Sequence, residues 1–266
     1  FRTKQGIKNI HPSVAETLGG SAPDYAQNDL FHAIDQGDFP KWGVYIQVMT
    51  EAEAQQREEN PFDVTKVWSQ KDYPLIEVGE FVLNRNPLNY FAEVEQVAMS
   101  PSNVIPGTGL SPDRMLQGRV FAYADAQRYR IGTNYQQLPV NAPKCPYHNY
   151  QRDGAMRFDG NQGSGPNYEP NSFTDAPKQT NQKNPAYNVG QEGSVYQYDH
   201  RDDTDYYSQA GALFRLMNDE QKALLIDNIV SSMTGIDPTI QLRQIEHFTK
   251  ADPAYGDGVA KGLGLK

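Results

Sequence analysis

Three residues in one stretch of the sequence have types and spacing suited to holding a metal. Arg119 and Tyr123 are four residues apart, and Arg130 follows seven residues after Tyr123. On a helix the first two share a face, and Arg130 returns to nearly the same side two turns later. A cation beside a tyrosine favours the phenolate, which is an oxygen ligand for ferric iron. An arginine–tyrosine pair on a helix is more often purely structural, so the spacing alone leaves both interpretations open.

The residues around this trio predict the helix that would carry it. Ser111 is a good N-cap, Pro112 suits the first helical position and Gly132 is placed to end the helix. Gly118 inside the helix costs roughly 1 kcal/mol relative to alanine. A glycine there would let a flat group approach the helix closely.

Two further segments have the pattern of strands. Apolar residues alternate from Trp42 to Met49, which is the period of a half-buried strand. A second run extends from Tyr73 to Leu83 and is bounded by Pro74 and by the break at 84–87. Their spacing predicts neighbouring strands in an antiparallel sheet or barrel.

The rest of the chain divides into an aperiodic segment and a helical one. From residue 134 to about 200 neither period holds and prolines recur, so we expect a long ordered segment lying over another surface. Asn218 and Gln221 form a capping-box pattern before an apolar stripe. Asp237 and Asp252 each precede a proline, and each pair predicts the start of another helix.

Composition excludes several classes of function. The net charge of −9 argues against nucleic-acid binding, and no apolar run approaches the roughly 20 residues of a membrane span. The single cysteine, Cys145, permits no disulfide within the chain, which favours a reducing, cytoplasmic location. The five histidines fit no zinc spacing, no nucleotide-binding glycine motif occurs, and Asp202 and Asp203 are expected in a solvated loop.

Residues 119–130 (RVFAYADAQRYR) match the proximal haem signature of the haem catalase family. Other segments resemble family sequence in family order, so that the resemblance covers essentially the whole chain and is greatest to bacterial small-subunit catalases. These segments are QGIKN (5–9), NPFDVTKVW (60–68), LNRNP (83–87), NYFAEVEQ (89–96), MLQG (115–118), PVN (139–141), NYQRDG (149–154) and DPAYG (252–256).

The resemblance implies an α+β fold in three parts. Residues 1–133 would be the C-terminal part of an antiparallel β-barrel together with the haem-ligand helix. Residues 134–204 would be the family's wrapping segment, and residues 205–266 its C-terminal helical domain. The family is tetrameric, so a homotetramer is expected.

The resemblance also implies a reaction and a cofactor, haem b. In the family, two molecules of hydrogen peroxide are converted to water and dioxygen. Tyr123 would be the axial ligand of the haem iron, Arg119 would keep its phenol deprotonated, and Arg130 would face a haem propionate. The other expected haem-pocket or near-pocket positions are Met99, Pro101, Met115 and Gln127, with core packing as the alternative for the two methionines. Gln127 stands where small-subunit catalases often have histidine.

The family's distal histidine and asparagine are not among these residues, and we expect them upstream of residue 1. The chain would then contain no catalytic residue and would not turn over peroxide alone. The missing half could be a separate chain. The alternatives are a non-catalytic haem-binding or assembly fragment of a split or truncated catalase, and a catalase-fold enzyme that converts lipid hydroperoxides.

Some members of the family bind NADPH through positions that correspond to Arg2, Val67, Trp68 and Gln70. Those members have histidine at the last of these positions. Because Gln70 replaces it, we expect NADPH to bind weakly or not at all.

Overall fold

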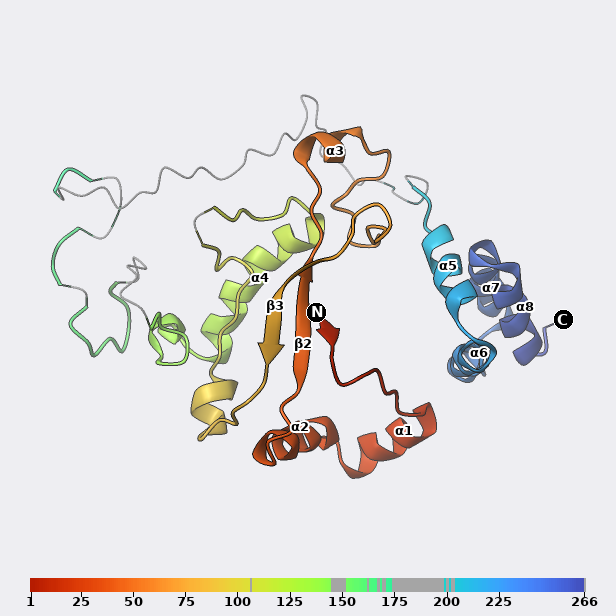
Figure 1. Ribbon diagram of the computed structural model, residues 1–266, viewed down its shortest axis with the longest axis horizontal. Helices are drawn as coiled ribbons and strands as arrows, with labels where there is room; N and C mark the ends of the chain where they lie inside the picture. Colours follow the sequence, from red (N-terminus) through yellow and green to blue (C-terminus); the bar gives the residue numbers. More distant parts are fainter. Residues whose placement is uncertain are drawn as a thin grey trace.

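The computed structural model describes residues 1–105, 107–144, 152–161, 163–166, 168, 171–173, 199, 201 and 204–265. These residues form an α+β structure with a small sheet, a long single helix beside it and a separate group of helices near the C-terminus (Figure 1). In chain order the elements are β1 Arg2–Thr3, α1 Pro12–Ser21, α2 Tyr25–Asp35, β2 Lys41–Ile46, α3 Glu51–Gln56, β3 Ile76–Val82, a π-helical turn Phe91–Glu95, α4 Arg114–Arg130, a 3-10 turn Tyr135–Gln137, α5 Ser208–Leu216, α6 Asp219–Met233, α7 Pro238–Ala251 and α8 Pro253–Gly262.

The sheet has three antiparallel strands in the order β1-β2-β3. Trp42 pairs with Phe81 and Ile46 with Ile76, so the two strands expected from the sequence are indeed antiparallel neighbours. Both are shorter than predicted, and beyond the end of the ladder the Gln47 side chain donates to the Tyr73 carbonyl at 2.6 Å. Within the described residues the sheet is open, and a closed barrel is not observed.

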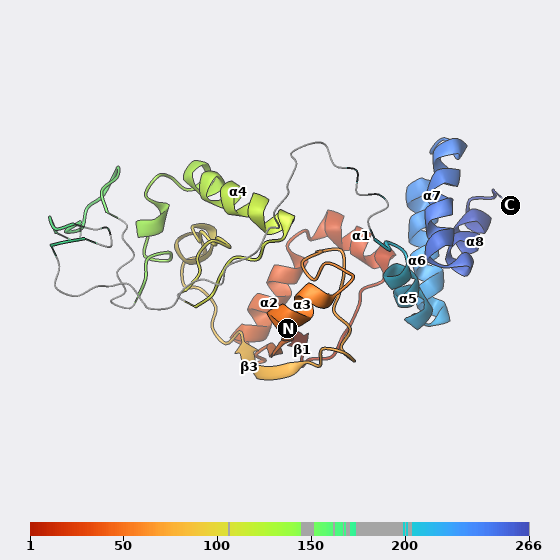
Figure 2. The ribbon, with the colours of Figure 1, turned by 90° about the horizontal axis from the view of Figure 1, so that it is seen from above.

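Helices α1 and α2 precede β2, and sequence analysis did not predict them. Pro12 stands at the start of α1, where the first amide would have no helical partner, and His11 caps it by accepting from the Ser13 amide at 3.3 Å. In α2 one residue, Ile34, is buried. Both helices lie near one end of the strands (Figure 1), and Figure 2 shows them beside the sheet from above.

The C-terminal helices begin where their caps predict. Asn218 and Gln221 form the reciprocal capping box of α6, and Asp237 and Asp252 cap α7 and α8 through their carboxylates. Among the described residues, the buried apolar side chains of this group are Phe214, Met233, Val259 and Ala260. Helices α7 and α8 cross closely at Gly256, where a Cβ atom would lie 2.0 Å from the Thr249 hydroxyl.

The helical group contacts the loop between α3 and β3 through polar groups. The Lys66 ammonium group donates a hydrogen bond to the Asp205 carbonyl, and its nitrogen lies 4.8 Å from the Tyr206 ring centroid. The Gln209 side chain accepts from the Val67 amide at 3.0 Å and donates to the Val67 carbonyl at 3.3 Å. This two-way bond joins α5 to a backbone segment 142 residues earlier in the chain.

Candidate functional site

Helix α4 carries the trio that sequence analysis singled out, and it begins two residues later than predicted. Its N-cap is Asp113 rather than Ser111, because the Asp113 carboxylate accepts the Leu116 amide at 2.7 Å. This hydrogen bond, with a weaker one from Ser111, lowers the pKa of Asp113 below its usual value. Pro112 therefore precedes the cap instead of opening the helix. The predicted end is confirmed, since the helix stops at Arg130 and Gly132 has a φ of +133°.

Arg119 and Tyr123 lie together on one face of α4, as their spacing predicts. The Arg119 guanidinium donates to the Tyr123 hydroxyl at 3.0 Å and its central carbon lies 5.0 Å from the ring centroid. Tyr123 is half-buried and Arg119 is exposed. The phenol oxygen is thus held beside a permanent positive charge.

Arg130 holds α4 to the residues that precede it in sequence. Its guanidinium donates to the carbonyls of Glu95 at 2.7 Å and Val97 at 2.5 Å. It also donates to the Gln127 side-chain oxygen at 2.8 Å, and the buried Gln127 in turn donates to the Met99 carbonyl at 3.4 Å. The guanidinium therefore anchors the 95–99 segment, and that segment carries Met99.

A third polar side chain, which sequence analysis assigned no role, fixes the same segment. Asn141 accepts from the Ala98 amide at 2.7 Å and donates to the Gln96 and Tyr135 carbonyls at 2.9 and 2.8 Å. Ala98 is buried, so its amide needs a partner. The only sequence signal was the position of Asn141 inside a family motif.

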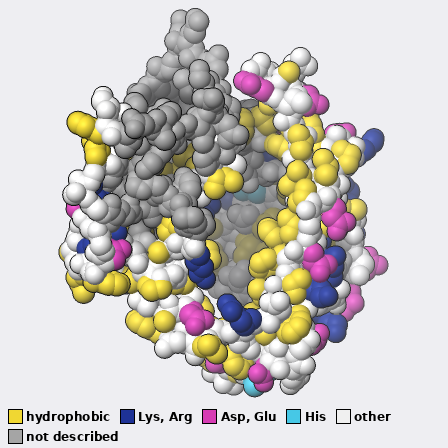
Figure 3. Space-filling view, turned by 60° about the vertical axis from the view of Figure 1, so that its left-hand side comes forward, with side chains coloured by type: hydrophobic (Ala, Val, Ile, Leu, Met, Phe, Trp, Pro, Cys, Tyr) yellow, Lys and Arg dark blue, Asp and Glu magenta, His cyan; other side chains and the backbone are white. Residues whose placement is uncertain are grey.

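Large apolar side chains near α4 are exposed. Figure 3 shows hydrophobic side chains gathered around a hollow in one face of the molecule. Gly118 on α4 has no described atom within 4 Å of the position its Cβ would take, so the described residues do not show the close packing expected there. Large exposed apolar side chains on α4 and on the segment before it include Leu88 (98%), Tyr129 (86%), Phe121 (81%), Met99 (75%), Ile105 (71%), Phe91 (62%) and Met115 (59%).

The positions expected from NADPH-binding relatives lie in one region. Arg2 donates to the Gln70 side chain at 2.8 Å, although the two are 68 residues apart. Val67 is 73% exposed, and both its backbone polar groups bond to Gln209. Trp68 donates its indole N–H to the Pro61 carbonyl at 3.2 Å. Each of these four residues thus has at least one polar group that is hydrogen-bonded within the chain.

The described part of the chain contains no group of three or more histidine, cysteine, aspartate or glutamate residues arranged to bind a metal ion. His11 bonds to Ser13, and His247 bonds to the Tyr207 hydroxyl at 2.8 Å. Among the described residues, no helix is both long and apolar enough to cross a membrane. Cys145, His148, His200 and the pair 202–203 lie outside the described residues, as does most of the predicted wrapping segment.

The profile of a family described as Catalase matches residues 1–175, and that of a family described as Catalase-related immune-responsive matches residues 200–263. Together with the fold and the arginine–tyrosine helix, the first match defines the class of protein. The chain belongs to the catalase family.

Individual relatives agree. The chain is 67% identical to "Catalase A" of Pseudomonas putida and 66% identical to "Catalase" of the Onchocerca volvulus endobacterium, each over all 266 residues. The solved structure of catalase A from Saccharomyces cerevisiae superposes with a TM-score of 0.88 at 40% identity and covers 98% of this chain. A bacterial catalase structure gives a TM-score of 0.85 at 39% identity over the whole chain. The chain spans about half the length of these relatives, 55% in each case.

Proposed function

We propose that this chain supplies the proximal side of a haem catalase, which converts hydrogen peroxide to water and dioxygen. The observation that carries the proposal is the Arg119–Tyr123 pair, with 3.0 Å between guanidinium nitrogen and phenol oxygen. The family relationship supports the reaction class.

The donor set fits a ferric haem. A phenolate is a hard anionic oxygen ligand, and tyrosinate is the axial ligand by which catalases hold haem iron. Tyr123 would be that ligand, and Arg119 would hold its oxygen deprotonated by hydrogen bonding and charge. When bound, the haem iron supplies the redox chemistry of peroxide disproportionation.

The residues around the pair would position the cofactor and exclude water from it. Met99 and Met115 are exposed apolar side chains, on the segment anchored to α4 and on α4 itself, which suits them to cover a flat macrocycle. Gln127 and Arg130 would act mainly by holding that segment. The propionate contact predicted for Arg130 stays a prediction, and a propionate would have to share the guanidinium with the carbonyls of residues 95 and 97.

Movement of a proton between the peroxide oxygens needs an acid–base group over the iron, and such help is typically worth about 10²–10⁴-fold. No histidine of the described residues lies in a segment that resembles the family's distal side. The distal histidine and asparagine of the family would have to come from the part of the fold found in the longer relatives. We also propose a homotetramer, a cytoplasmic location and weak NADPH binding at most.

The ligand assignment is tested in the haem-reconstituted protein with two variants. Tyr123→Phe removes the phenol oxygen, so the ferric Soret spectrum should change and haem affinity should fall sharply. Arg119→Ala should weaken ligation more mildly, because the phenolate loses its hydrogen-bond donor but stays in place.

Tyr129→Phe on the same helix is the matched control, because Tyr129 is 86% exposed. The Soret spectrum of this variant should be that of the wild type. An unchanged Soret spectrum and undiminished oxygen evolution in Tyr123→Phe would refute the assignment.

A further inference from the structure

Residues 205–209, where α5 begins, bind two different parts of the molecule at once. On one side the Asp205 carbonyl accepts a hydrogen bond from the Lys66 ammonium group. The Gln209 carboxamide accepts from the Val67 amide at 3.0 Å and donates to the Val67 carbonyl at 3.3 Å. These partners are 139 and 142 residues apart in the chain, so this side of the segment holds the loop between α3 and β3.

On its other side the same segment holds α7. The Tyr207 hydroxyl lies 2.8 Å from His247 Nδ1, and the two rings are stacked with an interplanar angle of 14°. The Lys250 ammonium nitrogen lies 5.7 Å from the Tyr207 ring centroid. Neighbouring residues at the start of α5 therefore connect the helical group to a loop in the first third of the chain.

The connecting segment is braced by its own side chain. The Asp205 carboxylate accepts from the Tyr207 amide at 2.9 Å and from the Ser208 amide at 3.0 Å. Local bonds of this kind fix the backbone of a helix start. The segment can therefore move together with α5.

The helical group has a core of its own. The Phe214 ring stacks on the Tyr255 ring with centroids 4.7 Å apart, and the Phe248 ring stacks on Tyr255 at the same distance. Val259 is fully buried in this group, and Arg215 pairs with Asp252 at 3.0 Å. Helices α5–α8 lie together at one end of the molecule in Figures 1 and 2. Their mutual packing does not depend on the bonds to the loop.

The bonds to the loop are, by contrast, open to water. The hydrogen bonds of Lys66 and Gln209 are both exposed, and Val67 is 73% exposed. Water competes for such groups, so each bond contributes little net stability. Parts of a fold held by a few exposed bonds are those that open locally at low cost.

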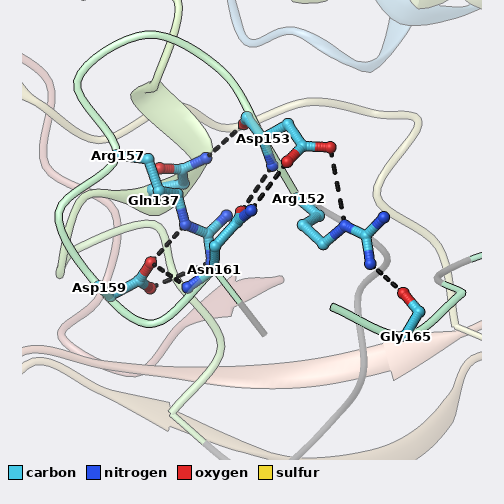
Figure 4. A network of polar contacts seen from close by, with 7 residues as sticks. All are labelled: Gln137, Arg152, Asp153, Arg157, Asp159, Asn161 and Gly165. Carbon is cyan, nitrogen blue, oxygen red and sulfur yellow. Dashed lines mark hydrogen bonds and ion pairs between the residues drawn. The ribbon is translucent and has the colours of Figure 1, made fainter. Parts of the chain in front are cut away.

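The polar network within residues 137–165 shows the difference (Figure 4). Asp153 and Asn161 bond reciprocally at 2.7 and 2.8 Å, and Arg157 forms an ion pair with Asp159. Opening of that network would rearrange a single stretch of chain. The bonds of residues 205–209 instead connect two distant parts of the fold.

We propose that residues 205–209 are a clasp on which α5–α8 open as one unit. Closed, as in this structure, the clasp satisfies the Val67 amide and carbonyl and the Lys66 ammonium group. Open, it exposes a hydrogen-bond donor, an acceptor and a cation on neighbouring residues. The clasp thus gates the polar surface of residues 66–67. It needs neither haem nor peroxide turnover, so it is independent of the function proposed above.

Distances between spin labels on the full chain, measured by double electron–electron resonance, test the opening. Labels at Glu77 of β3 and Glu220 of α6, both exposed, span the clasp. Labels at Glu220 and Lys261 of α8 lie within the helical group. A Cys145→Ser background leaves only the introduced cysteines, and dilution with unlabelled chains restricts the measurement to distances within one chain.

Two variants weaken the clasp. Gln209→Met and Lys66→Met keep roughly the size of each side chain and remove its hydrogen bonds. Each should raise the population of longer Glu77–Glu220 distances by about 5- to 10-fold and leave the Glu220–Lys261 distances unchanged. Gln56→Met is the matched control, because Gln56 is exposed on α3, outside the clasp, and both distance distributions should be those of the wild type.

Three results would overturn the proposal. The first is an unchanged Glu77–Glu220 distribution in both clasp variants. The second is a broadened Glu220–Lys261 distribution, because the helical group would then be unfolding instead of opening as a unit. The third is an equal rise of the longer distances in Gln56→Met, which would assign the opening to something other than the clasp.

Discussion

Replacing Asn141 by alanine should loosen the segment that carries Met99. The side chain makes three hydrogen bonds, to the Ala98 amide, the Gln96 carbonyl and the Tyr135 carbonyl. Each such bond contributes about 1 kcal/mol net, and the buried Ala98 amide would lose its partner. The expected loss is about 3 kcal/mol in the free energy of opening this segment.

Amide hydrogen exchange followed by mass spectrometry measures that opening locally. Each 1.4 kcal/mol is a factor of ten, so exchange of peptides covering residues 96–99 should accelerate by about 100-fold. The α6–α8 helices should keep their protection, because Asn141 does not contact them. If the segment anchors the haem pocket as proposed, haem affinity should fall as well.

Two variants make the Asn141 experiment interpretable. Asn141→Asp keeps an oxygen for the Ala98 amide but points a second oxygen at two carbonyls, so it should be destabilising despite its nearly equal size. Asn103→Ala changes an exposed asparagine in the neighbouring loop and should leave exchange unchanged. Unaltered exchange at 96–99 in Asn141→Ala would refute the idea that this side chain holds the segment.

The remaining predictions concern packing, pH and a second ligand. Gly256→Ala places a methyl group 2.0 Å from the Thr249 hydroxyl and should destabilise the helical group by about 1–3 kcal/mol in denaturant titration. Gly118→Ala has open space around the new methyl group and should stabilise α4 by about 0.5–1 kcal/mol. Changes of the same sign in the two variants would contradict this prediction. Hydrogen bonds from the start of α5 lower the pKa of Asp205 from 3.8 to about 2, so its contribution to α5 is complete above pH 4 and is lost as the pH falls towards 2. Asp205→Asn should abolish that pH dependence of α5 protection, and a persisting transition would assign it to another group. Calorimetric titration of the wild type should show weak or no NADPH binding, and the Gln70→His variant should bind NADPH more tightly. Sub-micromolar NADPH affinity in the wild type would contradict this prediction.

Local signals in the sequence located α4 and most of the C-terminal helices. Capping depends on residues within one turn, so Asn218, Asp237 and Asp252 mark helix starts without any knowledge of the fold. The pairing of Arg119 with Tyr123 was predictable for the same reason, because four residues of helix fix their separation.

Features set by distant backbone were not predictable. Arg130 contacts carbonyls 33 and 35 residues earlier, and every residue has a carbonyl, so no sequence pattern indicates which ones will be met. Gln47 likewise bonds to a backbone carbonyl 26 residues away, beyond the end of the strand ladder. Helices α1 and α2 bury few side chains, so the sequence showed little periodicity there. The domain boundaries at 133 and 204 stay a prediction.

The exposure of the apolar side chains around α4 bears directly on how the proposed ligand works. A guanidinium and a phenolate in water attract one another only weakly, because solvent screens them. The same pair at 3.0 Å under an apolar cover interacts far more strongly, since the effective dielectric is lower. Met99 and Met115, both exposed, would be part of that cover once a flat cofactor and the remaining part of the family fold lie over them. The strength of Tyr123 as a ligand should therefore depend on parts of the fold that never touch its oxygen, and ligation should weaken whenever water gains access to α4.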